Sequence, residues 1–154
     1  MTIRPLSTQE KADTGMTHSV KVTAADLTET TNNTAQAISL NPVVNGSVVK
    51  YGGYFLKTTF QDASDAAFND VAIELGDATV TSRYLASSQI NENGTEVTAG
   101  FTPYSSATAP HAYVAADTIL LTVGSMASKA LNDIDTGEVW LFISVVDYKP
   151  LTNA

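Results

Sequence analysis

The stretch EVWLFISVVDY, residues 138–148, decides the fold of this chain because it is its longest hydrophobic run. Side chains of a strand alternate between two faces, and here both faces are apolar. One face carries Val139, Leu141, Ile143 and Val145, and the other carries Trp140, Phe142, Val146 and Tyr148. A sandwich strand ordinarily shows one polar face to solvent, so the aromatic face needs a cover.

The sequence allows two ways in which the aromatic face can be covered. A loop or the N-terminal segment of the same chain can lie over the aromatic side, or a neighbouring subunit can pack against it. Aromatic residues are enriched in interface cores, and large exposed apolar patches are unusual on monomers. We therefore treat Trp140, Phe142, Val146 and Tyr148 as candidate protein-interface residues.

Upstream of this run, short apolar alternations are separated by Gly, Pro, Asn and Asp, which is typical of many short strands. The pattern predicts an all-β fold, a two-sheet antiparallel β-sandwich. The segments expected as strands lie near residue 22 and at 34–40, 49–60, 71–75, 80–84, 97–101 and 113–123. Residues 91–94, NENG, predict a hairpin turn, and residues 125–132 a single helical turn.

The apolar phase changes by one residue within the segment 49–60. Val49 and Tyr51 lie on odd positions, whereas Tyr54, Leu56 and Phe60 lie on even ones. We expect a bulge at Gly52 and Gly53, because glycine tolerates the dihedral angles that a bulge requires.

Residues 1–17 are polar, contain Pro5 and Gly15, and lack strand or helix periodicity. They predict an extended N-terminal arm that is either disordered or ordered on a neighbouring subunit. Arg4 and Leu6 in this arm join the candidate interface residues. Residues 18–154 form the predicted sandwich domain.

Composition excludes several functions. The net charge is −8, only 16% of residues are charged and there is no cysteine, so thiolate metal sites and disulfides are unavailable. An acidic chain without a basic stripe argues against nucleic-acid binding. No window approaches the roughly 20 apolar residues that cross a bilayer, so no membrane partner is expected.

Catalytic and metal motifs are also missing from the sequence. His18 and His111 are the two histidines, and neither belongs to a G-x-S-x-G or HExxH pattern. Asp133, Asp135 and Glu138 resemble part of a calcium loop but lack its third ligand and its flanking helices. Another acidic group, Asp62, Asp65 and Asp70, is expected to solvate an edge or loop. We expect no catalytic residue, metal or cofactor.

Four segments together resemble the capsid decoration, or cement, proteins of tailed bacteriophages. They are VTAADLTETTNNTAQAISL, FQDASDAAFNDVAIELGD, YVAADTILLTVGSM and ALNDIDTGEVWLFISVVDY. The resemblance implies a jelly-roll β-sandwich, often trimeric, bound to the capsid exterior where it clamps neighbouring subunits of the major capsid protein. It also implies a virion protein assembled in the host cytoplasm, with no catalytic residue.

The rival interpretation is a carbohydrate- or receptor-binding module of a head fibre or tail appendage. β-Sandwiches commonly host sugar sites in their loops, and Tyr104, His111 and Tyr113 would then line such a site. A hydrolase is the third alternative, and turnover that one carboxylate or histidine change abolishes would support it.

Overall fold

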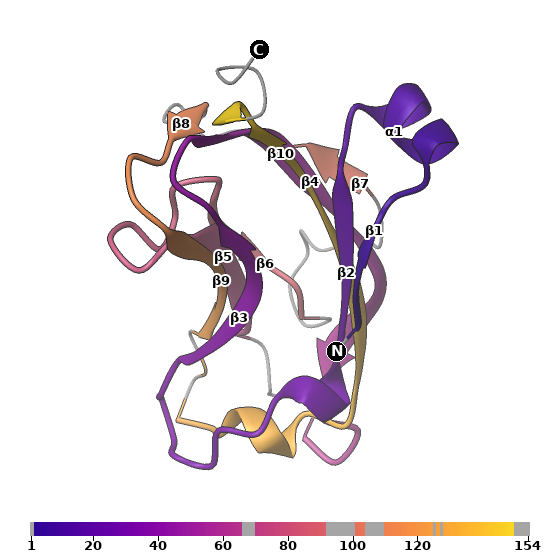
Figure 1. Cartoon of the computed structure of the whole chain (residues 1–154). Coiled ribbons are helices and arrows are strands. Elements are labelled where there is room, and N and C mark those ends of the chain that lie inside the picture. Colours follow the sequence, from indigo (N-terminus) through magenta and orange to yellow (C-terminus); the bar gives the residue numbers. More distant parts are fainter. Residues whose placement is uncertain are drawn as a thin grey trace.

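The chain is a sandwich of two antiparallel sheets in the computed structural model, which describes residues 2–65, 70–91, 101–103, 110–124, 126 and 128–149 (Figure 1). Sheet A has the order β1 (Thr2–Pro5), β2 (His18–Thr23), β10 (Thr136–Asp147), β4 (Ser47–Gln61) and β7 (Phe101–Pro103), and β8 (His111–Ala112) also pairs with β4. Sheet B has the order β3 (Gln36–Val43), β9 (Asp117–Gly124), β5 (Ala72–Gly76) and β6 (Leu85–Gln89). The prediction of an all-β, two-sheet sandwich is confirmed.

The strand order is that of a jelly roll. With β1 and β8 set aside, successive strands alternate between the two sheets except at β5 and β6, which pair within sheet B. The layers are β2-β10-β4-β7 and β3-β9-β5-β6. In a jelly roll, two sheets with this strand order pack face to face, so that the inner face of each sheet is buried against the other. The jelly-roll expectation therefore holds.

The inner face of β10 forms the centre of the core. Val139, Leu141 and Ile143 are buried there and face the inward residues of β9, Ile119, Leu121 and Val123. Each such side chain contributes about 1.5–3 kcal/mol by leaving water. Gly137, the second residue of the strand, has φ 147°, and a Cβ there would lie 2.4 Å from the Phe60 ring. Only glycine fits this close approach.

The predicted phase change in β4 is confirmed, but it lies two residues before the glycine pair. Ser144 pairs with Tyr51 while Val145 pairs with Val49, so Lys50 is the extra residue. Gly52 and Gly53 pair regularly with Ile143 and Phe142. The bulge lets Val49 and Leu56 both face the core from one bent strand.

The strand predicted at residues 80–84 is wrong. The Asp77 carboxylate accepts the backbone N–H groups of Thr79 and Val80 at 3.0 and 2.8 Å, which closes a turn, and β6 begins only at Leu85. Local side-chain bonding has overridden the β-propensity of this segment. Residues 92–100, which include most of the predicted hairpin and return strand, lie outside the described residues.

The expectation that residues 1–17 are extended throughout is wrong. β1 pairs with β2, and α1 (Thr8–Thr14) follows it. Ser7 and Glu10 form a reciprocal capping box, and Gly15 ends the helix with φ 71° while its N–H donates to Lys11. Capping therefore stabilises a helix that hydrophobic periodicity does not indicate. The domain boundary at residue 17 stays a prediction.

Two single-turn 3₁₀ helices complete the described secondary structure, η1 (Ala24–Asp26) and η2 (Leu131–Asp133). The latter begins inside the segment for which one helical turn is predicted. In the part of the chain that the structure describes, no helix combines the length and the apolar character needed to cross a bilayer.

Candidate functional site

Three aromatic residues form a surface on the outer side of sheet A, which we call the aromatic face: Phe55, Trp140 and Phe142. Trp140 pairs with Phe55 across β10 and β4, and Phe142 pairs with Gly53. The alternation that buries Val139 and Leu141 turns these rings outward. Phe55 is 39% exposed, and Trp140 and Phe142 are half-buried.

Three charged residues surround Trp140. Together with it they form what we call the Glu138 cluster: Glu138, Lys21, Lys57 and Trp140. The two lysines each lie 3.0 Å from the Glu138 carboxylate, one from β2 and one from β4. The Trp140 indole N–H donates to the same carboxylate at 2.8 Å, and the Lys21 Nζ lies 5.9 Å from the ring centroid. Hydrogen bonds from Trp140, Lys21 and Lys57 lower the pKa of Glu138 to about 2.

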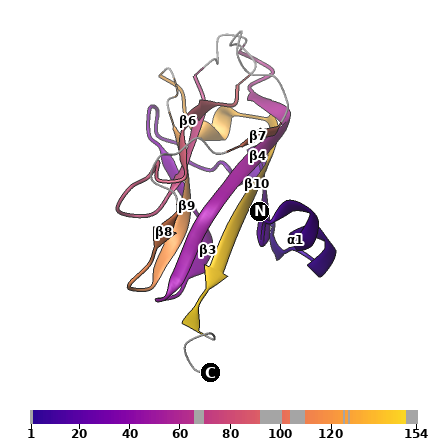
Figure 2. The same ribbon diagram turned by 90° about the horizontal axis from the view of Figure 1, so that it is seen from above.

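The N-terminal segment covers one end of the aromatic face. Figure 2 shows α1 on the outer side of β10, away from sheet B. Thr14 and Met16 at the end of this segment enclose a hollow of about 310 Å³ with Phe55 and Phe142. Thr17 holds the segment there, because its N–H and hydroxyl both donate to the Ile143 carbonyl. The chain therefore covers part of its own apolar face and leaves part exposed.

The other predicted interface residues lie in two places. Val146 is half-buried and Tyr148 is 36% exposed at the end of β10, where Lys50 lies 6.0 Å from the Tyr148 ring. Arg4 is exposed and makes two hydrogen bonds to Glu10, at 2.9 and 2.7 Å, that tie β1 to α1. Leu6 is 6% exposed, so its side chain is already covered by its own chain. The role of these residues as an interface stays a prediction.

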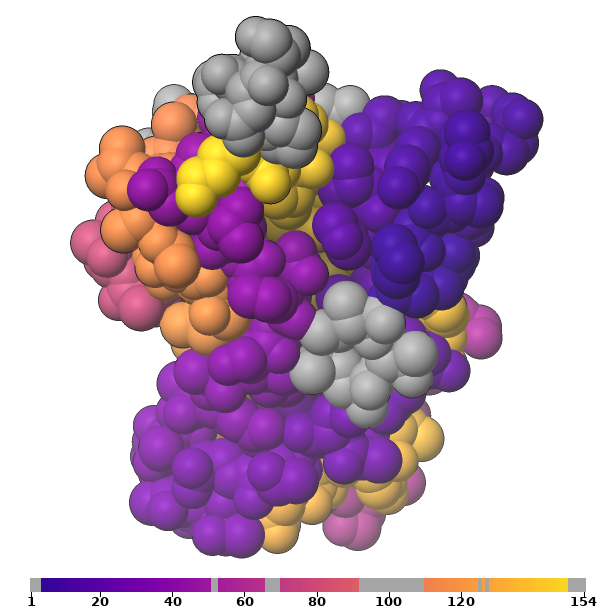
Figure 3. All heavy atoms as spheres, viewed as in Figure 1, coloured from indigo at the N-terminus to yellow at the C-terminus, as the bar shows by residue number. Residues whose placement is uncertain are grey.

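The two sheets differ in the sign of their charge. The strands of sheet A carry Arg4, Lys21, Lys50 and Lys57 against Glu138 and Asp147. The strands of sheet B carry Glu74 and Asp117 and no Lys or Arg. In a chain of net charge −8, four of the eight Lys and Arg residues therefore lie on the strands of sheet A. Two of these, Lys21 and Lys57, reach Glu138 beside Trp140. Figure 3 shows the N-terminal residues, in indigo, as a lobe that protrudes at one corner of the molecule.

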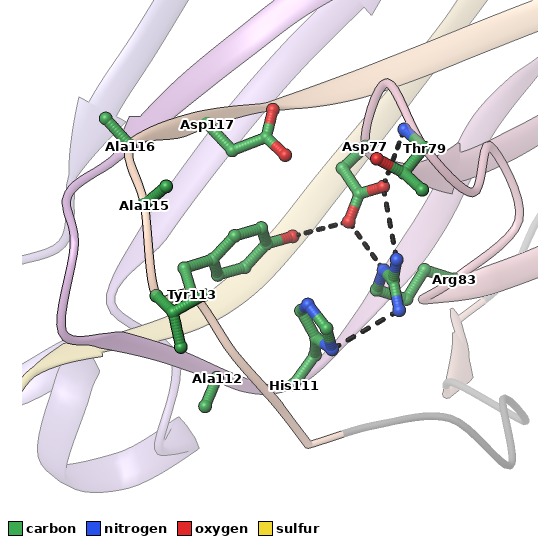
Figure 4. Close-up of a pocket in the computed structure, with 10 residues that line it drawn as sticks. Asp77, Thr79, Arg83, His111, Ala112, Tyr113, Ala115, Ala116 and Asp117 are labelled. Carbon is green, nitrogen blue, oxygen red and sulfur yellow. Dashed lines mark hydrogen bonds and ion pairs between the residues drawn. The ribbon is translucent and has the colours of Figure 1, made fainter.

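A second candidate site lies between the β5–β6 loop and the residues around β8 (Figure 4). Its centre is what we call the Asp77 network. The Asp77 carboxylate accepts from Arg83 Nε at 2.5 Å and from the Tyr113 hydroxyl at 2.9 Å. Tyr84 and Tyr113 share a hydrogen bond of 2.6 Å, and Arg83 lies 3.2 Å from His111 Nδ1. A hollow of about 210 Å³ lies beside the network.

The electrostatics of the Asp77 network follow from burial and pairing. Burial opposes the Asp77 charge, but bonds from Arg83, Val80 and Tyr113 outweigh it, so the pKa of this carboxyl is lowered. Burial raises the pKa of Tyr84 to about 12. The pKa of Tyr113 is also raised, by burial and then by its bond with Tyr84. Both tyrosines therefore stay protonated and can donate.

Two of the three residues predicted for a sugar site come together here. His111 and Tyr113 are edge-to-face at 4.8 Å between ring centroids, whereas Tyr104 lies outside the described residues. Sequence reasoning did not find Asp77 or Arg83. The signal available was Asp77 directly after Gly76, since aspartate at a turn start bonds the backbone two and three residues on.

The acidic segments noted in the sequence each have local partners. Asp135 accepts from the Ala63 N–H at 3.2 Å, whereas Glu138 joins its two lysines, so the suggested calcium ligands serve different contacts. Asp65 pairs with Lys129, and Asp62 accepts from Ser64. Among the described residues, no group of three His, Asp or Glu side chains is placed to hold a metal ion.

His18 also has a local partner. It lies at the start of β2, where its Nδ1 is 2.8 Å from the Thr17 hydroxyl. Burial lowers the pKa of His18, and Lys11 lowers it further.

Comparison with known proteins gives one structural likeness. No protein-family model matches the chain, and no curated protein matches it. A solved chain of the cyanophage Pam1 capsid asymmetric unit is similar, with a TM-score of 0.55 and 16% identity over 82% of this chain and 79% of that chain. This chain therefore has a fold that also occurs in a bacteriophage capsid.

Proposed function

We propose that this chain is a non-enzymatic virion structural protein that binds the exterior of a bacteriophage capsid and stabilises contacts between major capsid subunits. The aromatic face carries the proposal, because it is an apolar surface that the chain covers only in part. The fold shared with a phage-capsid chain supports the same class of role.

The aromatic face has the composition of an interface core. Aromatic residues dominate binding energy when they fill pockets at the centre of a contact and polar groups surround them. Here Phe55 and Phe142 line a hollow of about 310 Å³. Trp140 pairs with Phe55 and shares the Glu138 carboxylate with Lys21 and Lys57. An apolar side chain of the partner would fill the hollow.

The charge of sheet A indicates the partner's chemistry. Lys21 and Lys57 share one carboxylate, that of Glu138, at 3.0 Å each. An acidic segment of the capsid surface would add the second negative charge that this pair of lysines lacks. Complementary charge also speeds association and fixes orientation. A second copy of this chain, approaching with its own sheet A, would bring like charge.

We also propose a homotrimer, following the decoration proteins that the sequence resembles. A cyclic trimer repeats each modest contact three times, which raises avidity without any new type of interaction. Native mass spectrometry of the full chain would show a mass three times that of the 16.2 kDa chain. A single monomer peak at micromolar concentration would refute the trimer and leave the docking proposal intact.

Particle analysis tests the main proposal. Virions produced from the genome that encodes this chain would be purified, and cryo-electron microscopy would locate the chain. Density for the sandwich on the capsid exterior, with sheet A toward the major capsid protein, is the expected result. Absence of the chain from purified particles, or contact through sheet B, would contradict the proposal.

A further inference from the structure

We infer that the hollow beside the Asp77 network is a binding site for a single neutral saccharide ring. The polar part of its lining consists of Asp77, Thr79, Arg83, His111, Tyr113 and Asp117, and the apolar residues 112 and 114–116 complete it. This site shares no residue with the aromatic face, so the inference goes beyond capsid docking and does not depend on it.

The size of the hollow limits the ligand. Pockets for drug-sized molecules have volumes of about 300–1,000 Å³, whereas this one is about 210 Å³. A single ring, or the terminal ring of a longer chain, fits that space. Figure 4 shows the hollow framed by Asp117 on one side and His111 on the other, with Tyr113 between them.

The floor of the hollow is held in place before any ligand arrives. Asp77 is 1% exposed and the Arg83 side chain 14% exposed, and four different residues donate to the Asp77 carboxylate. Tyr84 supports Tyr113 from behind at 2.6 Å. Side chains fixed in this way lose little freedom on binding, which favours affinity.

Charge indicates a neutral ligand. Arg83 neutralises Asp77 through its 2.5 Å ion pair. Asp117 accepts the Thr118 N–H through one oxygen, and no Lys or Arg among the described residues forms an ion pair with it in the structure. The remaining negative charge disfavours phosphates, carboxylates and acidic sugars.

The mixture of polar groups suits vicinal hydroxyls. Asp117 accepts hydrogen bonds, Arg83 donates them, and Thr79 does both. The half-buried His111 ring supplies surface for the C–H groups of a sugar, and the buried Tyr113 ring holds it edge-to-face with centroids 4.8 Å apart. Each hydroxyl of a pyranose can donate and accept, so this lining matches it better than an amine, which only donates.

A second hollow on the outer face of sheet B provides an internal control. It is also about 210 Å³ and is lined by Ala35, Ala72, Glu74, Ser87, Thr122 and Gly124. It has one carboxylate but no arginine, histidine or aromatic ring. The two hollows therefore share their size and a carboxylate. They differ in the Asp77 network, which only the first of them has.

Saturation-transfer NMR on the full chain tests the inference, with the methyl glycosides of glucose, galactose, mannose and N-acetylglucosamine as probes. At least one probe should bind, and His111→Ala and Asp117→Asn should each weaken its affinity about tenfold or more. Glu74→Gln should leave the affinity unchanged. No binding of any probe, or equal binding by all three variants, would overturn the inference.

Two further arms define the ligand. N-acetylneuraminic acid, which is anionic, should bind more weakly than the neutral probes, and equal or tighter binding would overturn the neutral assignment. Oligosaccharides ending in the preferred ring should bind at least as well as its methyl glycoside, whether the natural source is a free sugar or a chain end. This binding experiment contains no capsid, so a failure to bind sugar does not contradict the docking proposal. In the same way, absence of the chain from virus particles does not contradict the saccharide site.

Discussion

The molecule holds two charged groups of opposite character, the Asp77 network and the Glu138 cluster. In the Asp77–Arg83 pair the side chains are 1% and 14% exposed, whereas in the Glu138–Lys21 pair they are 16% and 37% exposed. A buried ion pair is costly to break because one charge stays behind without a partner. A surface pair exchanges partners at little cost. The first group therefore belongs to the fold, and the second is available for a partner.

Removing the buried carboxylate has the largest expected effect. Asp77→Ala leaves Arg83 and Tyr113 without their acceptor and also removes the acceptor of two turn N–H groups. We expect the free energy of unfolding to fall by about 3–5 kcal/mol, as measured by urea denaturation. Glu74→Ala, a half-buried carboxylate on the neighbouring strand β5, is the control. A loss below about 1 kcal/mol would show that the network is not structural.

Truncating the centre of the aromatic face should have the second-largest effect, in this case on docking. Trp140→Ala removes the ring and the N–H donor to Glu138, and we expect docking to weaken by at least about 2 kcal/mol, or roughly thirtyfold in affinity. Co-sedimentation with particles measures docking, and analytical ultracentrifugation shows whether self-association weakens too.

Phe55→Ala is the companion variant, because Phe55 is 39% exposed and its loss costs the fold less. Thr122→Ala, on the outer face of sheet B, should dock as the parent chain does. If folded Trp140→Ala and Phe55→Ala both bind particles like the parent, the aromatic face is not the docking surface.

Removing one hydroxyl from the Asp77 network should have an intermediate effect. Tyr113→Phe takes away the donor to Asp77 and the partner of the Tyr84 hydroxyl, both in a buried setting. We expect a loss of about 1–3 kcal/mol in stability, measured by thermal and urea unfolding. Tyr148→Phe, on an exposed ring, should change nothing measurable. Equal stability of the two variants would contradict the difference drawn between the two regions.

The Glu138 cluster should show the smallest effect on stability, with a defined pH dependence. The pKa of Glu138 is lowered to about 2 in the folded chain, so its charged form stabilises the fold above its ordinary pKa. This contribution falls as the pH drops from there through about 2. Glu138→Gln should therefore differ slightly from the parent at neutral pH and match it in strong acid, in melting curves across that range. A difference that grows in acid would contradict the assignment.

Much of the sandwich was predictable because its strands follow the simplest pattern. Val139, Leu141 and Ile143 alternate with outward residues, and the phase change in β4 is visible as a shift from odd to even positions. The helix α1 was missed because hydrophobic periodicity was the criterion. Its two caps are nevertheless visible in the sequence, as Ser7 and Glu10 at the start and Gly15 at the end. The turn at Asp77 was missed because Val80 and Tyr84 have high β-propensity, and a side-chain acceptor outweighed it.

The sequence by itself determined the class of fold, the inner face of each main strand and the apolar character of the outer face of β10, because alternation and turn residues are local properties. Only the tertiary structure decided how far α1 covers that outer face, that Lys21 and Lys57 meet at Glu138, and that Asp77, Arg83 and Tyr113 share one network. These contacts join residues from different strands or loops. Their geometry depends on strand order and register, which no single segment encodes.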